Sequence, residues 1–215
     1  MIKRASNEII DLKSYEADMR YLLDTYIAAD GAKVISPFGD MPLIDIIVKS
    51  GIADAINDMP DGIKGNKEAV AETIENNVRK TIVDENPVNP KYYERMSELL
   101  DELIEQRRRK AIEYQEYLEK IRELSRKVIR PEQTGATYPP SLDTQAKRAL
   151  YDNVGQDEEL VTKIDTAIRY TKKADWVGDR FKEREIANAV REKTQGYKVD
   201  IKQVIELAKA QKEYQ

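Results

Sequence analysis

The sequence contains no cysteine and no histidine. The absence of cysteine excludes disulfides and thiolate nucleophiles, and the absence of both residues excludes zinc sites built from Cys or His. Catalytic triads of the Ser-His or Cys-His kind and imidazole acid–base chemistry are excluded in the same way. Composition therefore favours a protein that has no enzymatic activity of its own.

Long apolar runs are also missing. No run approaches the roughly 18 residues that a membrane-spanning helix needs, so no membrane span is predicted. The first eight residues, Met-Ile-Lys-Arg-Ala-Ser-Asn-Glu, contain no apolar signal core, so we do not expect export. We therefore expect a cytoplasmic protein.

Charged residues are abundant instead. The 36 Lys and Arg and 40 Asp and Glu make up 35% of the chain, against about 25% in an average soluble domain. The net charge is −4, so wholesale attraction to nucleic acid is not expected, although a local basic patch can still bind it. Apolar residues make up 40% of the 215 residues, which is enough for a core, and the length predicts one domain or one and a half.

Apolar residues recur at spacings of three and four through blocks that Gly and Pro separate, which is the pattern of amphipathic helices. The predicted helices cover residues 7–29, 42–50, 67–83, 90–129, 143–154, 157–173, 179–194 and a last block from Asp200. Asp40, Asn66 and Asn89 are predicted N-caps, and Asp200 begins a capping box. The short apolar block 42–50 is also compatible with a strand. The fold class that follows is all-α, with a long central helix packed against shorter helices in an irregular helical domain.

The long helix is predicted over 90–129 because no Gly or Pro occurs between Lys91 and Arg130. Its length would be about 60 Å at 1.5 Å per residue. Its 3-4 seam is apolar at both ends and basic in the middle, as in a coiled coil with a charged centre. We expect a helical subdomain over 1–130, a loop or hinge over 131–142 that contains Gly135, and a C-terminal helical subdomain over 143–215.

Four consecutive cations, Arg107, Arg108, Arg109 and Lys110, lie in the middle of that predicted helix. One interpretation is a patch that binds DNA phosphates or an acidic protein surface. The other is a solvated face that Glu102, Glu105 and Glu113 partly neutralise. Arg107 alone lies in the apolar seam, where it either extends its head to water or pairs with a carboxylate on a packed helix.

Aromatic usage is uneven, with twelve Tyr and one Trp against two Phe. Tyr and Trp combine apolar area with a hydrogen-bonding tip, which suits interfaces and the edge of a core. Tyr114, Tyr117 and Trp176 are therefore candidate contacts to a partner, with the core edge as the alternative.

No motif for a cofactor or a catalytic site is found. The stretch 62–68 has the wrong spacing for a phosphate-binding P-loop and lacks its Ser or Thr. Asp200-Ile201-Lys202 matches only the tripeptide of a metal-nuclease core and lies in a helical context. We therefore assign no catalytic, cofactor-binding or metal-binding residue.

Several extended stretches together resemble one family. They are Asp11-Leu-Lys-Ser-Tyr-Glu with Met19-Arg20, Met41-Pro-Leu-Ile-Asp-Ile-Ile-Val, Asn66-Lys-Glu-Ala-Val-Ala-Glu-Thr-Ile-Glu-Asn-Asn-Val-Arg, Asn89-Pro-Lys-Tyr-Tyr-Glu-Arg-Met-Ser-Glu-Leu-Leu-Asp-Glu-Leu-Ile, Ile112-Glu-Tyr-Gln-Glu-Tyr-Leu-Glu-Lys-Ile, Trp176, Glu185-Ile-Ala-Asn-Ala-Val-Arg and Ile205-Glu-Leu-Ala-Lys-Ala-Gln-Lys-Glu-Tyr. The chain is similar over nearly its whole length to the C-terminal helical region of the restriction (R) subunit of type I restriction–modification enzymes.

The resemblance implies a fragment without activity from a subunit that is, as a whole, an ATP-dependent type I deoxyribonuclease using ATP and Mg²⁺. It implies docking of that DNA-translocating nuclease subunit onto the methyltransferase (modification) and specificity subunits, with no cofactor in this part. The alternative is a duplex-tracking element that grips DNA phosphates through the basic patch.

Overall fold

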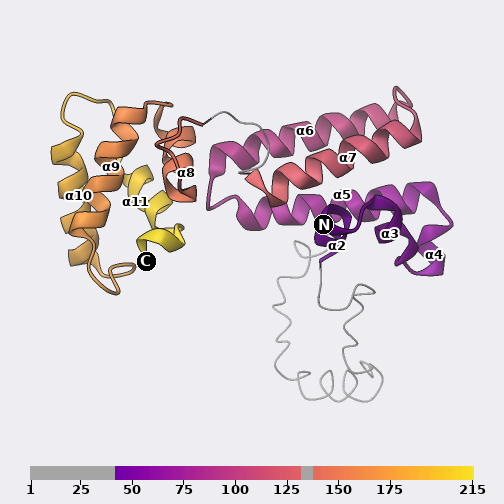
Figure 1. The fold of residues 1–215 in the computed structure, drawn as a ribbon, viewed down its shortest axis with the longest axis horizontal. Coiled ribbons are helices and arrows are strands. Elements are labelled where there is room, and N and C mark those ends of the chain that lie inside the picture. Colours follow the sequence, from indigo (N-terminus) through magenta and orange to yellow (C-terminus); the bar gives the residue numbers. More distant parts are fainter. Residues whose placement is uncertain (1–41, 132–137) are drawn as a thin grey trace, which may run out of the picture. The chain divides into compact units, whose positions relative to one another are not determined.

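The computed structural model describes residues 42–131 and 138–215, which lie within one compact unit of the chain, residues 37–215. These residues form ten α-helices and a short 3-10 helix: α2 (Leu43–Lys49), α3 (Ile52–Asn57), α4 (Asp61–Lys64), α5 (Lys67–Glu85), α6 (Pro90–Arg108), α7 (Tyr114–Ile129), α8 (Gln145–Val154), α9 (Glu158–Thr171), α10 (Arg180–Lys193), α11 (Ile201–Lys209) and η4 (Lys212–Tyr214) (Figure 1). The described residues contain no strand, so the all-α prediction is confirmed, and the ambiguous block 42–50 is a helix.

Some predictions fall on other parts of the chain. The helix over 7–29 and the cap Asp40 lie outside the described residues, as do residues 132–137 with Gly135. The hinge over 131–142 therefore stays a prediction.

Side-chain caps fix where most of the longer helices begin. Asn66 accepts hydrogen bonds from the backbone N–H groups of Glu68 and Ala69, and Asn89 accepts one from Tyr92 N–H. Asp200 caps α11 in the same way. Each cap satisfies backbone donors that have no partner inside the helix, and the predicted N-caps at these three positions are confirmed.

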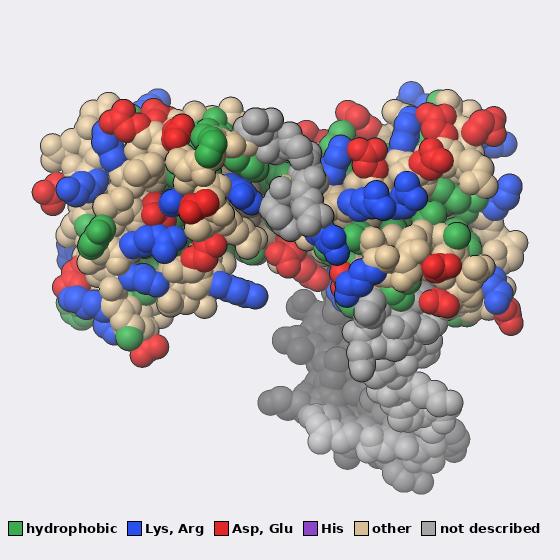
Figure 2. Space-filling view, in the orientation of Figure 1, with side chains coloured by type: hydrophobic (Ala, Val, Ile, Leu, Met, Phe, Trp, Pro, Cys, Tyr) green, Lys and Arg blue, Asp and Glu red, His purple; other side chains and the backbone are tan. Residues whose placement is uncertain are grey.

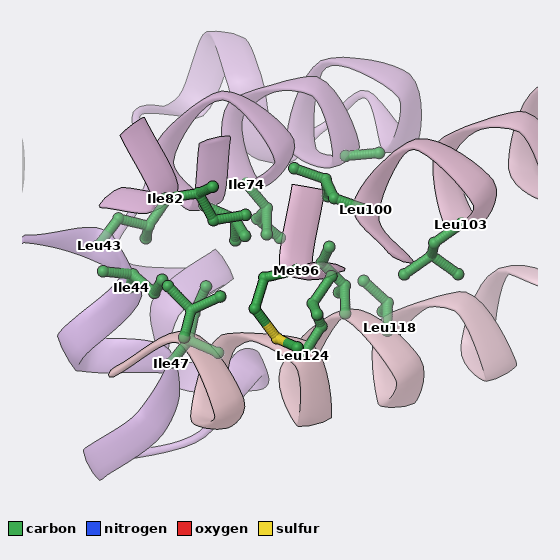
Figure 3. Close-up of a cluster of buried hydrophobic side chains, with 14 of the residues drawn as sticks. Leu43, Ile44, Ile47, Ile74, Ile82, Met96, Leu100, Leu103, Leu118 and Leu124 are labelled. Carbon is green, nitrogen blue, oxygen red and sulfur yellow. The ribbon is translucent and has the colours of Figure 1, made fainter. Parts of the chain in front are cut away.

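The first core is formed by α2, α5, α6 and α7, whose apolar stripes converge (Figure 3). Ile44 and Ile47 of α2 meet Ile74 of α5, while Met96 of α6 and Leu124 of α7 close the cluster. These side chains are almost fully buried. The residues between α2 and α5 form the two short helices α3 and α4. Ala55 of α3 and Met59, between the two helices, also enter this core.

The predicted long helix over 90–129 is wrong. It is two antiparallel helices, α6 and α7, which pack side by side as a hairpin with a turn over residues 109–113 (Figure 1). A continuous helix would leave the two ends of its apolar seam far apart. Because the chain folds back at the basic centre of the seam, both apolar ends share one core with α5. The free energy gained by burying this apolar area outweighs the loss of the helical hydrogen bonds that the turn interrupts.

The second core is formed by α8, α9, α10, α11 and η4. The stripe predicted for α9 faces inward as expected, with Leu160, Val161, Ile164, Ala167 and Ile168 buried. Gly155 follows α8 with a positive φ of 113°, a left-handed conformation that Gly adopts without strain, which confirms the predicted helix stop.

A polar contact links residues of the two cores. Asn89, the cap of α6, donates to Asp152 of α8 at 2.7 Å and accepts from the side chain of Asn153 at 2.8 Å. All three side chains are buried. Because buried amides and carboxylates need partners, this arrangement holds the start of α6 against α8.

Lys and Arg side chains are interspersed with Asp and Glu on the face drawn in Figure 2. Within the described ranges, no helix combines the length and the apolar character that crossing a membrane requires.

Candidate functional site

The basic cluster Arg107–Lys110 covers the end of α6, at Arg107 and Arg108, and the start of the turn to α7, at Arg109 and Lys110. Ala111 N–H bonds to the carbonyl of Gln106 and Lys110 N–H bonds to that of Arg107, both at 2.9 Å. This is the Schellman pattern of a helix C-terminus, in which one residue takes the left-handed conformation. That residue is Lys110, with φ 54°, in a place where Gly is usual. These four residues, hereafter the basic tip (residues 107–110), therefore end α6 and begin a turn of defined structure.

Arg107 points back from the basic tip into the helical bundle, where it meets two carboxylates of α5. Its Nε lies 2.8 Å from Glu75 Oε1, its Nη2 lies 3.1 Å from Glu75 Oε2, and its Nη1 pairs with Glu68. The side chains of Arg107 and Glu75 are 8% and 6% exposed. Of the two alternatives for Arg107, the ion pair with a packed helix is confirmed.

Tyrosines complete this buried group. Tyr117 of α7 donates from its hydroxyl to Glu75 Oε1 at 3.0 Å, and the Arg107 guanidinium lies 5.6 Å from the centre of its ring. Tyr114 stacks on Tyr117 with a centroid distance of 6.2 Å, and Lys67 Nζ lies 5.2 Å from the centre of the Tyr114 ring. Three helices, α5, α6 and α7, are thus joined at one polar point inside an apolar bundle.

The electrostatics match this geometry. Burial would lower the pKa of Arg107, but its hydrogen bonds to Glu75 and Glu68 outweigh burial and raise that pKa above its ordinary value. Burial first, and then the charge and hydrogen bond of Glu75, raise the pKa of Tyr117 well above 10.0. Arg107 stays charged and Tyr117 stays neutral across any ordinary pH, so the group is a fixed structural element.

The other three cations of the basic tip face solvent. Arg108, Arg109 and Lys110 are exposed, and Arg109 pairs with Glu105 one turn back at 2.5 Å. Arg108 and Lys110 form no ion pair with any residue in the described ranges. Of the three acids expected to neutralise the cluster, Glu105 does so. The basic tip therefore offers three cations to a partner instead of four.

Of the two alternatives for the aromatic candidates, partner contact and the edge of a core, their burial agrees with a position in or beside a core. Tyr117 is buried, Tyr114 is half-buried beside it, and Trp176 is buried in the second core. Trp176 donates from its indole N–H to the carbonyl of Tyr214 at 2.6 Å. Tyr117 and Trp176 offer no surface to a partner in this structure because both complete a core, and Trp176 lies in a different core from the basic tip.

Sequence reasoning missed Glu68 and Glu75 as the partners of Arg107. A signal was present for Glu75, because it follows Ala71 by four residues and Ile74 by one, on the inward face of α5. A carboxylate on an apolar stripe requires a cation in the facing stripe, and Arg107 interrupts the stripe of α6.

Within the described part of the chain, no group of three Asp or Glu side chains is arranged as a metal site. Comparison with known proteins adds no relative: no family model, no curated protein and no solved structure matches the chain.

Proposed function

We propose that this chain is a non-catalytic assembly domain from the R subunit of a type I restriction enzyme. It would dock the DNA-translocating nuclease subunit onto the methyltransferase and specificity subunits in the cytoplasm. The ATP and Mg²⁺ of the parent enzyme would be used by other parts of that subunit. The extended resemblance described above supports the family, and the geometry of the basic tip supports docking.

The observation that best supports docking is that the basic tip is anchored to the bundle while three of its four cations face outward. Arg107 anchors the turn to Glu75 in the bundle, and Arg108, Arg109 and Lys110 extend from it. A preorganised charged surface binds with less loss of side-chain and loop entropy than a mobile one. An acidic surface on the partner would be attracted to the tip and oriented by it.

The test is calorimetric binding of the whole chain to the methyltransferase–specificity complex at two salt concentrations. The test variant carries Arg108→Glu with Lys110→Glu, and the matched control carries Lys80→Glu with Lys202→Glu. Both change the net charge equally at exposed positions. We expect about tenfold weaker binding for the tip variant, equal to about 1.4 kcal/mol, and wild-type affinity for the control.

Absence of binding by the wild-type chain would reject the assembly function. Equal weakening in both variants would show that only net charge matters and would reject the basic tip as the contact.

The alternative function is contact with duplex DNA phosphates, which the outward cations of the tip also favour. Three phosphate contacts predict a log–log salt slope of about −3. Binding of bare duplex with that slope, together with no binding to the protein complex, would replace the assembly function by a tracking function.

A further inference from the structure

Exposed hydrophobic side chains gather at one end of the α9–α10 pair. Tyr170 lies in the last turn of α9 and is 88% exposed, and Phe181 lies in the first turn of α10 and is 83% exposed. Val177, in the loop that connects the two helices, is 44% exposed. Because α9 and α10 pack antiparallel, the three residues share one end of the pair (Figure 1). Tyr170, Val177 and Phe181 are here called the apolar end.

Two arginines flank Phe181 without a carboxylate partner. Arg180 and Arg184 are exposed, lie one turn apart on the same side of α10, and form no ion pair with any residue between 42–131 or 138–215. Neighbouring cations are already paired: Lys173 binds Glu185 at 2.6 Å and Lys182 binds Asp179 at 3.7 Å. The unpaired charges beside Phe181 in the first two turns of α10 are therefore both positive.

The loop that presents these side chains is fixed by several contacts. Trp176 is buried next to Val177 and bonds to Tyr214. Lys182 Nζ donates to the carbonyl of Ala174 at 2.8 Å, and Gly178 N–H donates to Glu183 at 2.8 Å. A surface held in one conformation loses little entropy on binding, so the apolar end is preorganised for a partner.

We propose that the apolar end is a second docking surface, whose occupant is a protein with an apolar recess bordered by carboxylates. The inference rests on the proposed function, and the recess would belong to the methyltransferase–specificity complex. Phe181 and Tyr170 enter the recess, and Arg180 and Arg184 pair with its acidic border. Exposed aromatics beside arginine are the residue types that contribute most to protein interfaces.

A second copy of this chain fits less well. Two aromatic side chains and one Val bury roughly 400–600 Å², since an aromatic buries about 150–250 Å². A stable dimer that has no other contact needs about 800 Å² on each partner, whereas the proposed partner complex would also contact the basic tip. A twofold contact would also leave the unpaired arginines of both copies at one interface.

Nucleic acid also fits less well. Proteins bind single strands by stacking bases on aromatic rings and by contacting phosphates with cations. Val177 has no ring on which a base could stack.

The experiment uses the whole chain and the methyltransferase–specificity complex, with calorimetric affinities at low and high salt. One variant carries Tyr170→Ser and Phe181→Ser, a second carries Arg180→Glu and Arg184→Glu, and the control carries Val83→Ser. Val83 is an exposed hydrophobic of α5, 65% exposed and remote in sequence from α9. Because the substituted side chains are exposed, we expect unchanged unfolding midpoints.

The expected result is at least about tenfold weaker binding for both test variants and wild-type affinity for the control. The loss of affinity in the serine variant should persist at high salt, whereas the loss of affinity in the glutamate variant should become smaller, because salt screens charges. Wild-type affinity in both test variants would overturn this inference and leave the proposed function intact. No binding by the wild-type chain would overturn both.

Two further outcomes would assign the apolar end to a different binding partner. A single-stranded oligonucleotide that binds the wild type but not the serine variant would assign the apolar end to nucleic acid. Concentration-dependent dimers in sedimentation, lost in the serine variant, would assign it to a second copy.

Discussion

Neighbouring arginines of the basic tip have different physical roles. Arg107 is buried with Glu75, while Arg109 pairs with Glu105 in water. An exposed pair contributes about 0–1 kcal/mol, because solvent screens it and both side chains lose entropy. Removing one partner of a buried pair costs about 3–5 kcal/mol, because the remaining charge has no water and no counter-ion. Position in the bundle, not residue type, decides the effect of a substitution.

We predict that Arg107→Met lowers the free energy of unfolding by about 3–5 kcal/mol, since Glu75 then stays buried without a cation. The double variant Arg107→Met with Glu75→Met should recover most of this loss, because it removes both charges and adds apolar volume. Urea unfolding followed by circular dichroism measures both values.

The matched control is Arg109→Met, for which we expect a change within about 0.5 kcal/mol. A loss of the same size in Arg107→Met and Arg109→Met would contradict the buried ion pair.

At the scale of elements, the turn between α6 and α7 depends on one left-handed lysine. The left-handed conformation costs an L-residue about 1–2 kcal/mol, and Gly avoids that cost while losing about 0.5–1 kcal/mol more backbone entropy on folding. We predict that Lys110→Gly, at φ 54°, raises the free energy of unfolding by about 0.5–1 kcal/mol in urea titrations.

A continuous helix through Lys110 makes the opposite prediction, since Gly inside a helix costs about 1 kcal/mol. Destabilisation of that size would therefore contradict the hairpin. Lys120→Gly, inside α7, is the positive control and should show this helical cost.

Most helices were predictable because their signals are local. The side chains of Asn66 and Asn89 accept hydrogen bonds from the first turns of α5 and α6, and Gly155 ends α8. The turn at Lys110 was not predictable in this way, because no Gly or Pro marks it and only packing against α5 favours it. The basic tip was predicted as a cluster, but which of its cations is buried depends on Glu75, 32 residues earlier.

The apolar end illustrates the same limit at the surface. Tyr170 and Phe181 lie off the buried stripes of their helices. The sequence analysis did not single them out, and their common location depends on how the loop between α9 and α10 folds around the buried Trp176.

At the scale of the whole molecule, one arrangement of side chains recurs and accounts for part of the excess of Tyr over Phe. A buried carboxylate accepts a hydrogen bond from a tyrosine hydroxyl and pairs with an arginine. The groups are Glu75 with Tyr117 and Arg107, Asp152 with Tyr138 and Arg95, and Asp165 with Tyr214 and Arg169. Phe would fill the same space but leave each carboxylate with one donor fewer, which favours Tyr at these positions.

This arrangement predicts how stability depends on alkaline pH. Burial first, and then the partner carboxylate, raise the pKa of Tyr117, Tyr138 and Tyr214 above the ordinary 10.0. The folded chain keeps these phenolic protons at a pH where the unfolded chain has released them. The stabilisation is therefore complete below pH 10 and is lost as the pH rises above it.

We predict that the free energy of unfolding falls between pH 10 and 11.5, with Tyr117 and Tyr214 each contributing at most about 1.4 kcal/mol per pH unit. Other groups, lysines above all, titrate in the same range, so the variants Tyr117→Phe and Tyr214→Phe isolate the effect. At pH 8 the free energy of unfolding of each variant should be about 1 kcal/mol lower than that of wild type, because its carboxylate lacks a donor. Above pH 10 it should then fall less steeply with pH than that of wild type.

Tyr170→Phe, at an exposed position, should follow the wild-type profile. Parallel profiles for all four proteins would show that these tyrosines ionise equally in the folded and unfolded chain, and would remove the buried hydroxyl–carboxylate bonds as the cause.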